Sequence, residues 1–170
     1  MLSPRNAASW LIWHAVIVLV ACFSLGAAAD GTDSASLLFE SYYVPLHKIT
    51  RFAPTRIPDS GLNWKMQDYL RFSDKEPLNF AGKYTLFKIG CGTNCVEFCL
   101  IDRTTGIVHP GMSFNTFFPI DYKGPWDFEY RLDSRLLVVY HSRGFGDPVL
   151  VDYYAWDGTA FILLKTARVS

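Results

Sequence analysis

The chain has 170 residues, 50% of which are hydrophobic, and its 16 basic side chains balance its 16 acidic ones, so the formal net charge is zero. This composition excludes a polar disordered chain, and the lack of clustered lysine and arginine excludes a protein that binds nucleic acid through its phosphates. A chain of this length buries most of its apolar side chains in one compact domain.

The first 29 residues have the layout of a secretory signal peptide. Arg5 is the only charged side chain before an apolar stretch over 10–25, and three alanines at 27–29 precede Asp30. The stretch of about 16 residues is shorter than the ~20 residues that span a bilayer as a helix. We therefore predict cleavage after Ala29 and export to the periplasm or the extracellular space.

The segment around Cys22 offers an alternative processing site. Leu19, Val20, Ala21 and Cys22 resemble the bacterial lipobox, in which the cysteine is lipidated after cleavage. The apolar run continues past Cys22, whereas a lipid-anchored terminus usually opens into a polar tether. We therefore expect membrane contact only through the signal peptide or, in this alternative, through a lipidated Cys22.

Residues 30–60 are predicted to form an extended N-terminal arm. Three prolines interrupt this segment, and its hydrophobic residues follow no sustained helical or strand period. Its apolar patches at 37–39 and 42–46 are too hydrophobic for a free linker. We expect the arm to lie against the body of the protein.

A short amphipathic helix is predicted at about 62–72. Apolar side chains recur there at i, i+4, i+7 and i+8, with polar side chains on the opposite face. Asp59 or Ser60 can cap its N-terminus, because a side-chain oxygen there accepts from the free amides of the first turn, and Pro77 ends any continuation. The apolar positions are Leu62, Met66, Tyr69 and Leu70.

From residue 79 onward the hydrophobic pattern changes to the period of two that is typical of strands. Thr105-Gly106 and Asp157-Gly158 mark two hairpin turns, since such pairs tolerate the positive φ angles of tight turns. The predicted fold class is α+β and mostly β, a single antiparallel β-sheet domain over 61–170 with one short packed helix. The predicted strands are 82–89, 95–102, 107–109, 128–132, 136–141, 149–156 and 160–165.

Three of the four cysteines lie close together in the segment 90–99. Cys91 and Cys95 bracket a Gly-Thr-Asn turn, which brings their Cβ atoms close enough for a local disulfide in an oxidising compartment. Cys99 is then predicted to be a small buried hydrophobe, with pairing to Cys91 or Cys95 as the alternative. The cysteine spacing matches neither a zinc site nor a thioredoxin-like redox pair, so we expect no metal and no cofactor.

Four short blocks of the sequence are similar to blocks found in a group of other proteins. They are 79–84 (Asn-Phe-Ala-Gly-Lys-Tyr), 90–95 (Gly-Cys-Gly-Thr-Asn-Cys), 130–137 (Tyr-Arg-Leu-Asp-Ser-Arg-Leu-Leu) and 153–158 (Tyr-Tyr-Ala-Trp-Asp-Gly). Together they resemble a family of short exported bacterial proteins without an assigned activity. The resemblance covers roughly 39–164 and implies export and a β-rich domain. It supplies no catalytic residue, and Cys99 is not part of the pattern.

The sequence contains no clear catalytic constellation. No serine lies in a Gly-x-Ser-x-Gly motif, because the nearest match, 111–115, ends in Asn115 instead of glycine. A hydrolase would need either Cys99 with His141 as its base or a pair of carboxylates. A buried thiol, a strand-end histidine and solvated acids explain the same residues, so we expect no catalytic residue. The candidate carboxylates are Glu97, Asp102, Asp121, Asp127, Glu129 and Asp133.

Aromatic side chains make up 16% of the chain and crowd the irregular region 114–128. Flat rings bury a large area at low entropic cost, so an exposed group of them is suited to contact with another molecule. The turn at 143–148 would make a further exposed contact loop. The predicted contact surface consists of Phe114, Phe117, Phe118, Tyr122, Trp126, Arg143 and Phe145.

These observations together predict an exported, non-enzymatic binding protein of the bacterial cell envelope. Its expected partner is another envelope protein, and an interaction of the inhibitor or immunity type fits this description. Two alternatives belong to other classes of protein. One is an envelope hydrolase that uses a carboxylate pair or a Cys-His pair, and the other is a lipid-anchored structural component.

Overall fold

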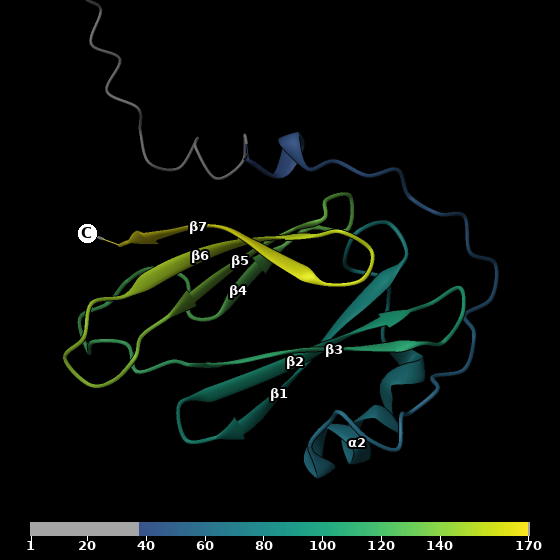
Figure 1. The fold of residues 1–170 in the computed structure, drawn as a ribbon, viewed down its shortest axis with the longest axis horizontal. Coiled ribbons are helices and arrows are strands. Elements are labelled where there is room, and N and C mark those ends of the chain that lie inside the picture. The colour runs from purple at the N-terminus through teal and green to yellow at the C-terminus, as the bar shows by residue number, and fades with distance from the viewer. Residues whose placement is uncertain (1–37, 170) are drawn as a thin grey trace, which may run out of the picture.

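The computed structural model describes residues 38–169 and shows two antiparallel β-sheets that lie face to face (Figure 1). The predicted class, mostly β with a short packed helix, is confirmed, and the strands divide between two sheets. The predicted signal peptide and Cys22 lie outside the described residues. The elements are α2 (Trp64–Leu70), the 3-10 helix η1 (Ser73–Lys75), β1 (Tyr84–Gly92), β2 (Cys95–Asp102), β3 (Val108–Asn115), β4 (Phe128–Tyr130), β5 (Leu136–His141), β6 (Leu150–Trp156) and β7 (Phe161–Arg168).

The first sheet has the strand order β1-β2-β3, the second has the order β4-β5-β6-β7, and neighbouring strands are antiparallel. Strands β2 and β5 begin and end at the residues that the sequence predicts. Strand β3 is longer than predicted and contains Pro110, which pairs with Cys99 at a shift in register. An edge strand tolerates a proline because the missing N–H can face away from the sheet.

The main core fills the space between the two sheets. Phe98 and Leu100 of β2 belong to it. Leu137 and Val139 of β5 and Trp156 of β6 complete its centre from the other sheet. The residues between these positions point to the outer faces, where they join two further apolar clusters. The central strands are therefore buried on both faces, which explains their nearly continuous apolar sequence.

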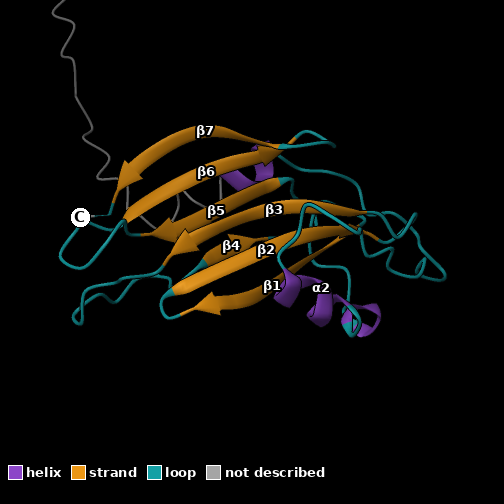
Figure 2. Ribbon diagram, turned by 60° about the horizontal axis from the view of Figure 1, so that its bottom comes forward, coloured by secondary structure: helices purple, strands orange, loops and turns teal. Residues whose placement is uncertain are grey.

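Helix α2 covers the outer face of the first sheet, beside β1 in Figure 2. Met66 and Leu70 lie one turn apart on the helix and are buried against a cluster that contains Ile89, Cys99 and Ile101 of β1 and β2. Burying each of these apolar side chains contributes about 1.5 to 3 kcal/mol to stability. The helix is thus held by packing, since seven residues are too few for a stable isolated helix.

The helix begins later than predicted, which changes its cap. Asn63 is the N-cap, and its side-chain oxygen accepts a hydrogen bond from the Met66 N–H at 2.9 Å. The predicted caps Asp59 and Ser60 are therefore wrong. Tyr69, expected on the apolar face, is 54% exposed because so short a helix turns one narrow stripe toward the sheet.

The first residues that the structure describes lie on the outer face of the second sheet. Residues 38–41 form one helical turn, and Phe39 is buried there in the cluster that contains Leu136 and Val138 of β5. Ser134 anchors this turn by donating a hydrogen bond from Oγ to the Phe39 carbonyl oxygen at 2.9 Å. Each sheet therefore has its outer face covered by one helical piece.

Residues 43–56 then run round to the first sheet (Figure 1). The Arg56 N–H donates to the Gly106 carbonyl oxygen at 2.8 Å, which places the segment against the turn between β2 and β3. Gly106 has a φ of 78°, and a Cβ at this position would lie 2.0 Å from the Pro54 carbonyl oxygen. The turn therefore needs glycine both for its backbone angle and for the close approach of the N-terminal segment.

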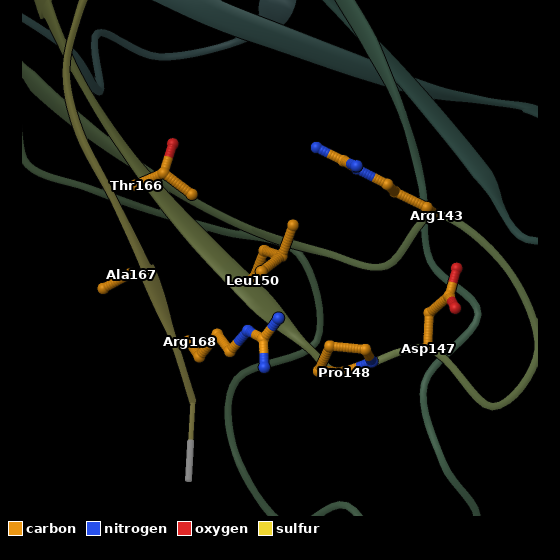
Figure 3. Close-up of a pocket in the computed structure, with 7 residues that line it drawn as sticks. All are labelled: Arg143, Asp147, Pro148, Leu150, Thr166, Ala167 and Arg168. Atoms are coloured by element: carbon orange, nitrogen blue, oxygen red, sulfur yellow. The ribbon is translucent and has the colours of Figure 1, made fainter.

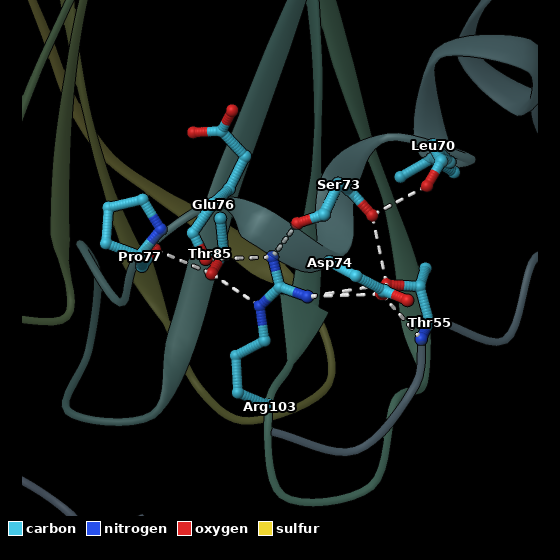
Figure 4. Close-up of polar contacts among 8 residues, drawn as sticks. All are labelled: Thr55, Leu70, Ser73, Asp74, Glu76, Pro77, Thr85 and Arg103. Carbon is cyan, nitrogen blue, oxygen red and sulfur yellow. Dashed lines mark hydrogen bonds and ion pairs between the residues drawn. The ribbon is translucent and has the colours of Figure 1, made fainter. Parts of the chain in front are cut away.

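A fully buried arginine lies where η1, β1 and the end of β2 meet. The Arg103 Nε donates to Thr85 Oγ1 at 2.7 Å. Its Nη2 donates to the carbonyl oxygens of Ser73 at 2.6 Å and Glu76 at 3.3 Å, and its Nη1 lies 3.9 Å from the Asp74 carboxylate. Figure 4 shows the guanidinium group at the centre of these partners. One side chain thereby ties η1 to the first sheet.

The N-terminal segment completes the enclosure of Arg103. The ring of Phe52 lies 5.4 Å from the guanidinium carbon, within the range of a cation–π contact. Thr55 donates through both its N–H, at 3.0 Å, and its Oγ1, at 2.6 Å, to the Asp74 carboxylate. The same aspartate therefore faces the arginine and holds the N-terminal segment over it.

We expect Arg103→Lys to lower the free energy of unfolding by about 2 to 4 kcal/mol, because lysine keeps the charge but cannot supply the same fork of donors to its buried partners. Urea denaturation at neutral pH measures the change. Arg131→Lys is the matched control, since Arg131 is 42% exposed and pairs with Asp133 at the surface, and it should change stability by less than about 0.5 kcal/mol. Equal effects of the two substitutions would contradict the role assigned to Arg103.

Asp102 makes the stability sensitive to acid. Burial raises the pKa of this carboxyl, but hydrogen bonds from Lys83 at 2.7 Å and from Thr104 outweigh it, so the pKa lies below its usual 3.8. A lowered pKa in the folded state adds stability above about pH 4, and this stability is lost as the pH falls through the lowered value. We expect Asp102→Asn to flatten the loss of stability between pH 5 and pH 2. Urea denaturation across that range checks this, and an unchanged slope would refute it.

Candidate functional site

Two loops and the end of β7 meet at one end of the molecule. The loop 116–127 leads from β3 to β4 and so crosses from the first sheet to the second, and the loop 142–149 joins β5 to β6. Both lie at the left of Figure 1, on the same side as the C-terminus. We call these two loops together with residues 166–169 the loop end.

The disulfide turn positions the beginning of both loops. Cys91 and Cys95 form a disulfide across the ends of β1 and β2, which confirms the predicted pairing. Within the turn, Asn94 adopts a φ of 54°, and its carbonyl oxygen accepts a hydrogen bond from the Thr116 N–H at 2.8 Å. The loop 142–149 is held to the end of β3 in the same region, where the Ser142 N–H donates to the carbonyl oxygen of residue 115 at 3.1 Å. A series of backbone contacts thus leads from the disulfide to both loops.

An ion pair fixes the other end of the loop 116–127. Lys88 Nζ of β1 lies 2.5 Å from Asp127 Oδ2, and the Asp127 carbonyl oxygen accepts a hydrogen bond from the Tyr140 N–H at 2.8 Å. Asp127 therefore contacts one strand of each sheet. With both ends held, the loop has less conformational entropy left to lose than a free loop of the same length.

The loop end groups five aromatic residues into two clusters. The rings of Phe117 and Phe145, from different loops, lie 4.6 Å apart. Phe118 lies 4.9 Å from Tyr122 and 5.3 Å from Trp126. Phe145 is 83% exposed and Trp126 is 60% exposed, so each cluster presents a ring to solvent. The two clusters consist of Phe117 with Phe145 and of Phe118 with Tyr122 and Trp126. Ile120, which is fully exposed, lies between Phe118 and Tyr122 in sequence.

Phe114 is the member of the predicted contact surface that lies elsewhere. It is partly buried and packs against the core between the sheets, with its ring 6.4 Å from that of Phe98 and 5.9 Å from that of Phe128. Because Phe114 still belongs to β3, its side chain follows the alternation of that strand into the core. The remaining predicted contact residues lie at the loop end.

A cavity of about 490 Å³ opens beside the loop 142–149 (Figure 3). Arg143 and Asp147 line it from this loop, and Arg168 lines it from the end of β7. Leu150 and Pro148 form part of its wall, and in Figure 3 the two arginines lie on different sides of Leu150. We call this cavity the arginine pocket.

A second cavity, of about 560 Å³, adjoins the arginine pocket through Pro148, which lines both. Tyr122 and Lys123 line it from the loop 116–127. The aromatic cluster that contains Tyr122 therefore borders this cavity, and the loop end combines exposed rings with two neighbouring hollows.

A buried carboxylate lies behind the arginine pocket. Asp152 of β6 is 7% exposed and contacts His141 Nε2 at 3.0 Å. It also accepts hydrogen bonds from Tyr154 Oη at 3.1 Å and from Thr166 Oγ1 at 2.6 Å, and Thr166 itself lines the pocket. Burial, followed by the charge of Asp152, raises the pKa of Tyr154 to about 12, so its hydroxyl remains a donor at neutral pH. The network joins β5, β6 and β7 and supports the pocket wall.

The structure does not bring Cys99 and His141 together. Cys99 faces helix α2, where its sulfur lies 3.7 Å from that of Met66, and burial raises the pKa of its thiol to about 12. The His141 ring instead lies 5.6 Å from that of Phe114, which packs against the core between the sheets. The Cys99 thiol is therefore buried, protonated at neutral pH and without the base that a nucleophile needs.

Three candidate carboxylates are held in separate ion pairs. Asp102 pairs with Lys83, Asp127 with Lys88, and Asp133 with Arg131. Among residues 38–169, no group of three His, Cys, Asp or Glu side chains is arranged to hold a metal ion. These acids act as structural partners for lysine and arginine side chains.

No family model matches the chain, and no curated protein or solved structure matches it either. Within the described part of the chain, no helix has the length and apolar character needed to cross a membrane. The interpretation of the site therefore depends on its own geometry and chemistry.

Removal of the buried carboxylate should weaken the second sheet. We expect Asp152→Ala to lower the free energy of unfolding by about 2 to 4 kcal/mol, because the hydroxyls of Tyr154 and Thr166 and the His141 ring lose their shared acceptor. Thermal and urea denaturation measure the effect. Asp147→Ala, at an exposed position five residues earlier, should change stability by less than about 0.5 kcal/mol. A neutral effect of Asp152→Ala would contradict the proposed support of the pocket wall.

Proposed function

We propose that this chain is an exported, non-enzymatic binding protein of the bacterial cell envelope and that it contacts a partner protein through the loop end. The observation that carries the proposal is that two loops meet through the rings of Phe117 and Phe145. These loops leave Phe145 and Trp126 largely exposed and also line two cavities. Exposed aromatic rings on well-positioned loops are a common basis of protein recognition.

Several features support the individual parts of this proposal. The layout of residues 1–29 favours export, and a disulfide between Cys91 and Cys95 persists best in an oxidising compartment. A binding role without catalysis agrees with the separation of Cys99 from His141. The zero formal net charge favours a protein partner over nucleic acid.

Helix α2 presents a second group of exposed rings and serves as the comparison surface. Trp64 is 73% exposed and Phe72, just beyond the helix, is 72% exposed. These two side chains come from one short stretch of chain, whereas the rings of the loop end come from separate loops around two cavities. We therefore assign partner contact to the loop end.

Photo-crosslinking in living cells tests the assignment. A benzophenone amino acid is placed at Phe145, at Trp126 or at Trp64, and the adducts are separated and identified by mass spectrometry. We expect one defined protein adduct from Phe145 and Trp126 and none from Trp64, although all three positions are largely exposed. Adducts from Trp64 alone, or the same adducts from all three positions, would contradict binding through the loop end.

A further inference from the structure

The arginine pocket contains two guanidinium groups without acidic partners. Within residues 38–169, the side chains of Arg143 and Arg168 form no ion pair and no hydrogen bond. Arg131 and Arg103 differ, since Arg131 pairs with Asp133 at 3.1 Å and the fully buried Arg103 has five polar partners around it. Two cations that share one cavity repel each other, so an anion between them would be stabilised.

The charge of the pocket lining matches a monoanion. Two arginines and Asp147 give a net charge of one positive. The Thr166 hydroxyl lines the same cavity but already donates to Asp152, so the two arginines remain as the donors that a ligand can use. A dianion such as phosphate would leave a net negative charge in the pocket and would lie near the Asp147 carboxylate.

The remaining walls of the pocket are apolar. Pro148 and Leu150 line it beside the arginines, and Ala167 lines it from β7. The volume of about 490 Å³ is within the ~300 to 1,000 Å³ that is usual for sites of small organic ligands. A ligand that fits both kinds of wall has one planar anionic group and one compact apolar part.

We propose that the arginine pocket binds a carboxylate that is attached to an apolar group, with Arg143 and Arg168 donating to its oxygens. Guanidinium groups suit this role because their parallel N–H donors match the two oxygens of a carboxylate. The inference rests on the proposed function only for the source of the carboxylate, which is either an acidic residue of the partner or a free small molecule. The binding itself is measured without the partner.

Benzoate and benzamide provide a matched pair of probes, because they have the same shape but only benzoate is charged. We expect benzoate to shift the backbone amide NMR signals of Gly144, Gly146 and Leu150 in the full chain. Benzamide should bind at least about tenfold more weakly. Inorganic phosphate, the doubly charged probe, should also bind more weakly than benzoate.

Single substitutions test the two arginines. Arg143→Gln and Arg168→Gln should each weaken benzoate binding by about tenfold or more, whereas Arg51→Gln, at another exposed position, should leave it unchanged. Equal binding of benzoate and benzamide, stronger binding of phosphate, or unchanged benzoate binding in both pocket variants would overturn the proposal. The amide spectrum of each variant shows directly whether it is folded.

The Phe145 cross-link identifies the source of the carboxylate. If the double variant of Arg143 and Arg168 loses both benzoate binding and the cross-link, the partner supplies the carboxylate. If it loses benzoate binding but keeps the cross-link, the pocket binds a free carboxylate. Both results uphold the pocket, whereas benzoate binding by a wild-type chain that gives no cross-link would overturn the proposed function alone.

Discussion

The buried guanidinium of Arg103 is the interaction on which the arrangement of the first sheet and its covering segments depends. A charge removed from water must be surrounded by acceptors, and Arg103 finds them on β1, on η1 and on the carboxylate of Asp74. Thr55 of the N-terminal segment bonds to that same carboxylate. Segments that share no strand pairing are thereby brought to one point, and helix α2, directly before η1, is placed over the apolar face of the sheet.

Local patterns predicted the strands well, because each strand has its own alternation of apolar and polar side chains. Strands β2 and β5 have the predicted ends, and the disulfide joins the predicted cysteines. The division into two sheets could not be predicted, since it depends on which strands pair across the loop 116–127. Arg103 was also missed, because its partners Thr85, Ser73 and Glu76 lie 18 to 30 residues away and no local pattern connects them.

In the candidate site, too, contacts between residues that are distant in sequence could not be predicted from local patterns. The sequence identified the aromatic residues of the loop end, but the contact of Phe117 with Phe145 joins residues that are far apart in the chain. Phe114 was grouped with the aromatic residues of the loop because the predicted strand ended at residue 109, whereas β3 continues to Asn115. Asp152 carried a usable signal, a single acid within the otherwise uncharged strand Leu150–Trp156, and Arg168 carried none because its role depends on the position of the loop 142–149.

The disulfide between Cys91 and Cys95 closes a ring of five residues, so the position of the loop end also depends on whether these two cysteines are oxidised. Asn94, inside the ring, holds Thr116 at the start of the loop 116–127. A chain whose thiols are still reduced keeps the same asparagine but lacks the covalent closure that restricts its backbone. The hydrogen bond to Thr116 then fixes the start of the loop less firmly, while the contacts of Asp127 still hold its other end. Oxidation of the two thiols therefore determines how firmly the start of the loop 116–127, and with it Phe117, is held.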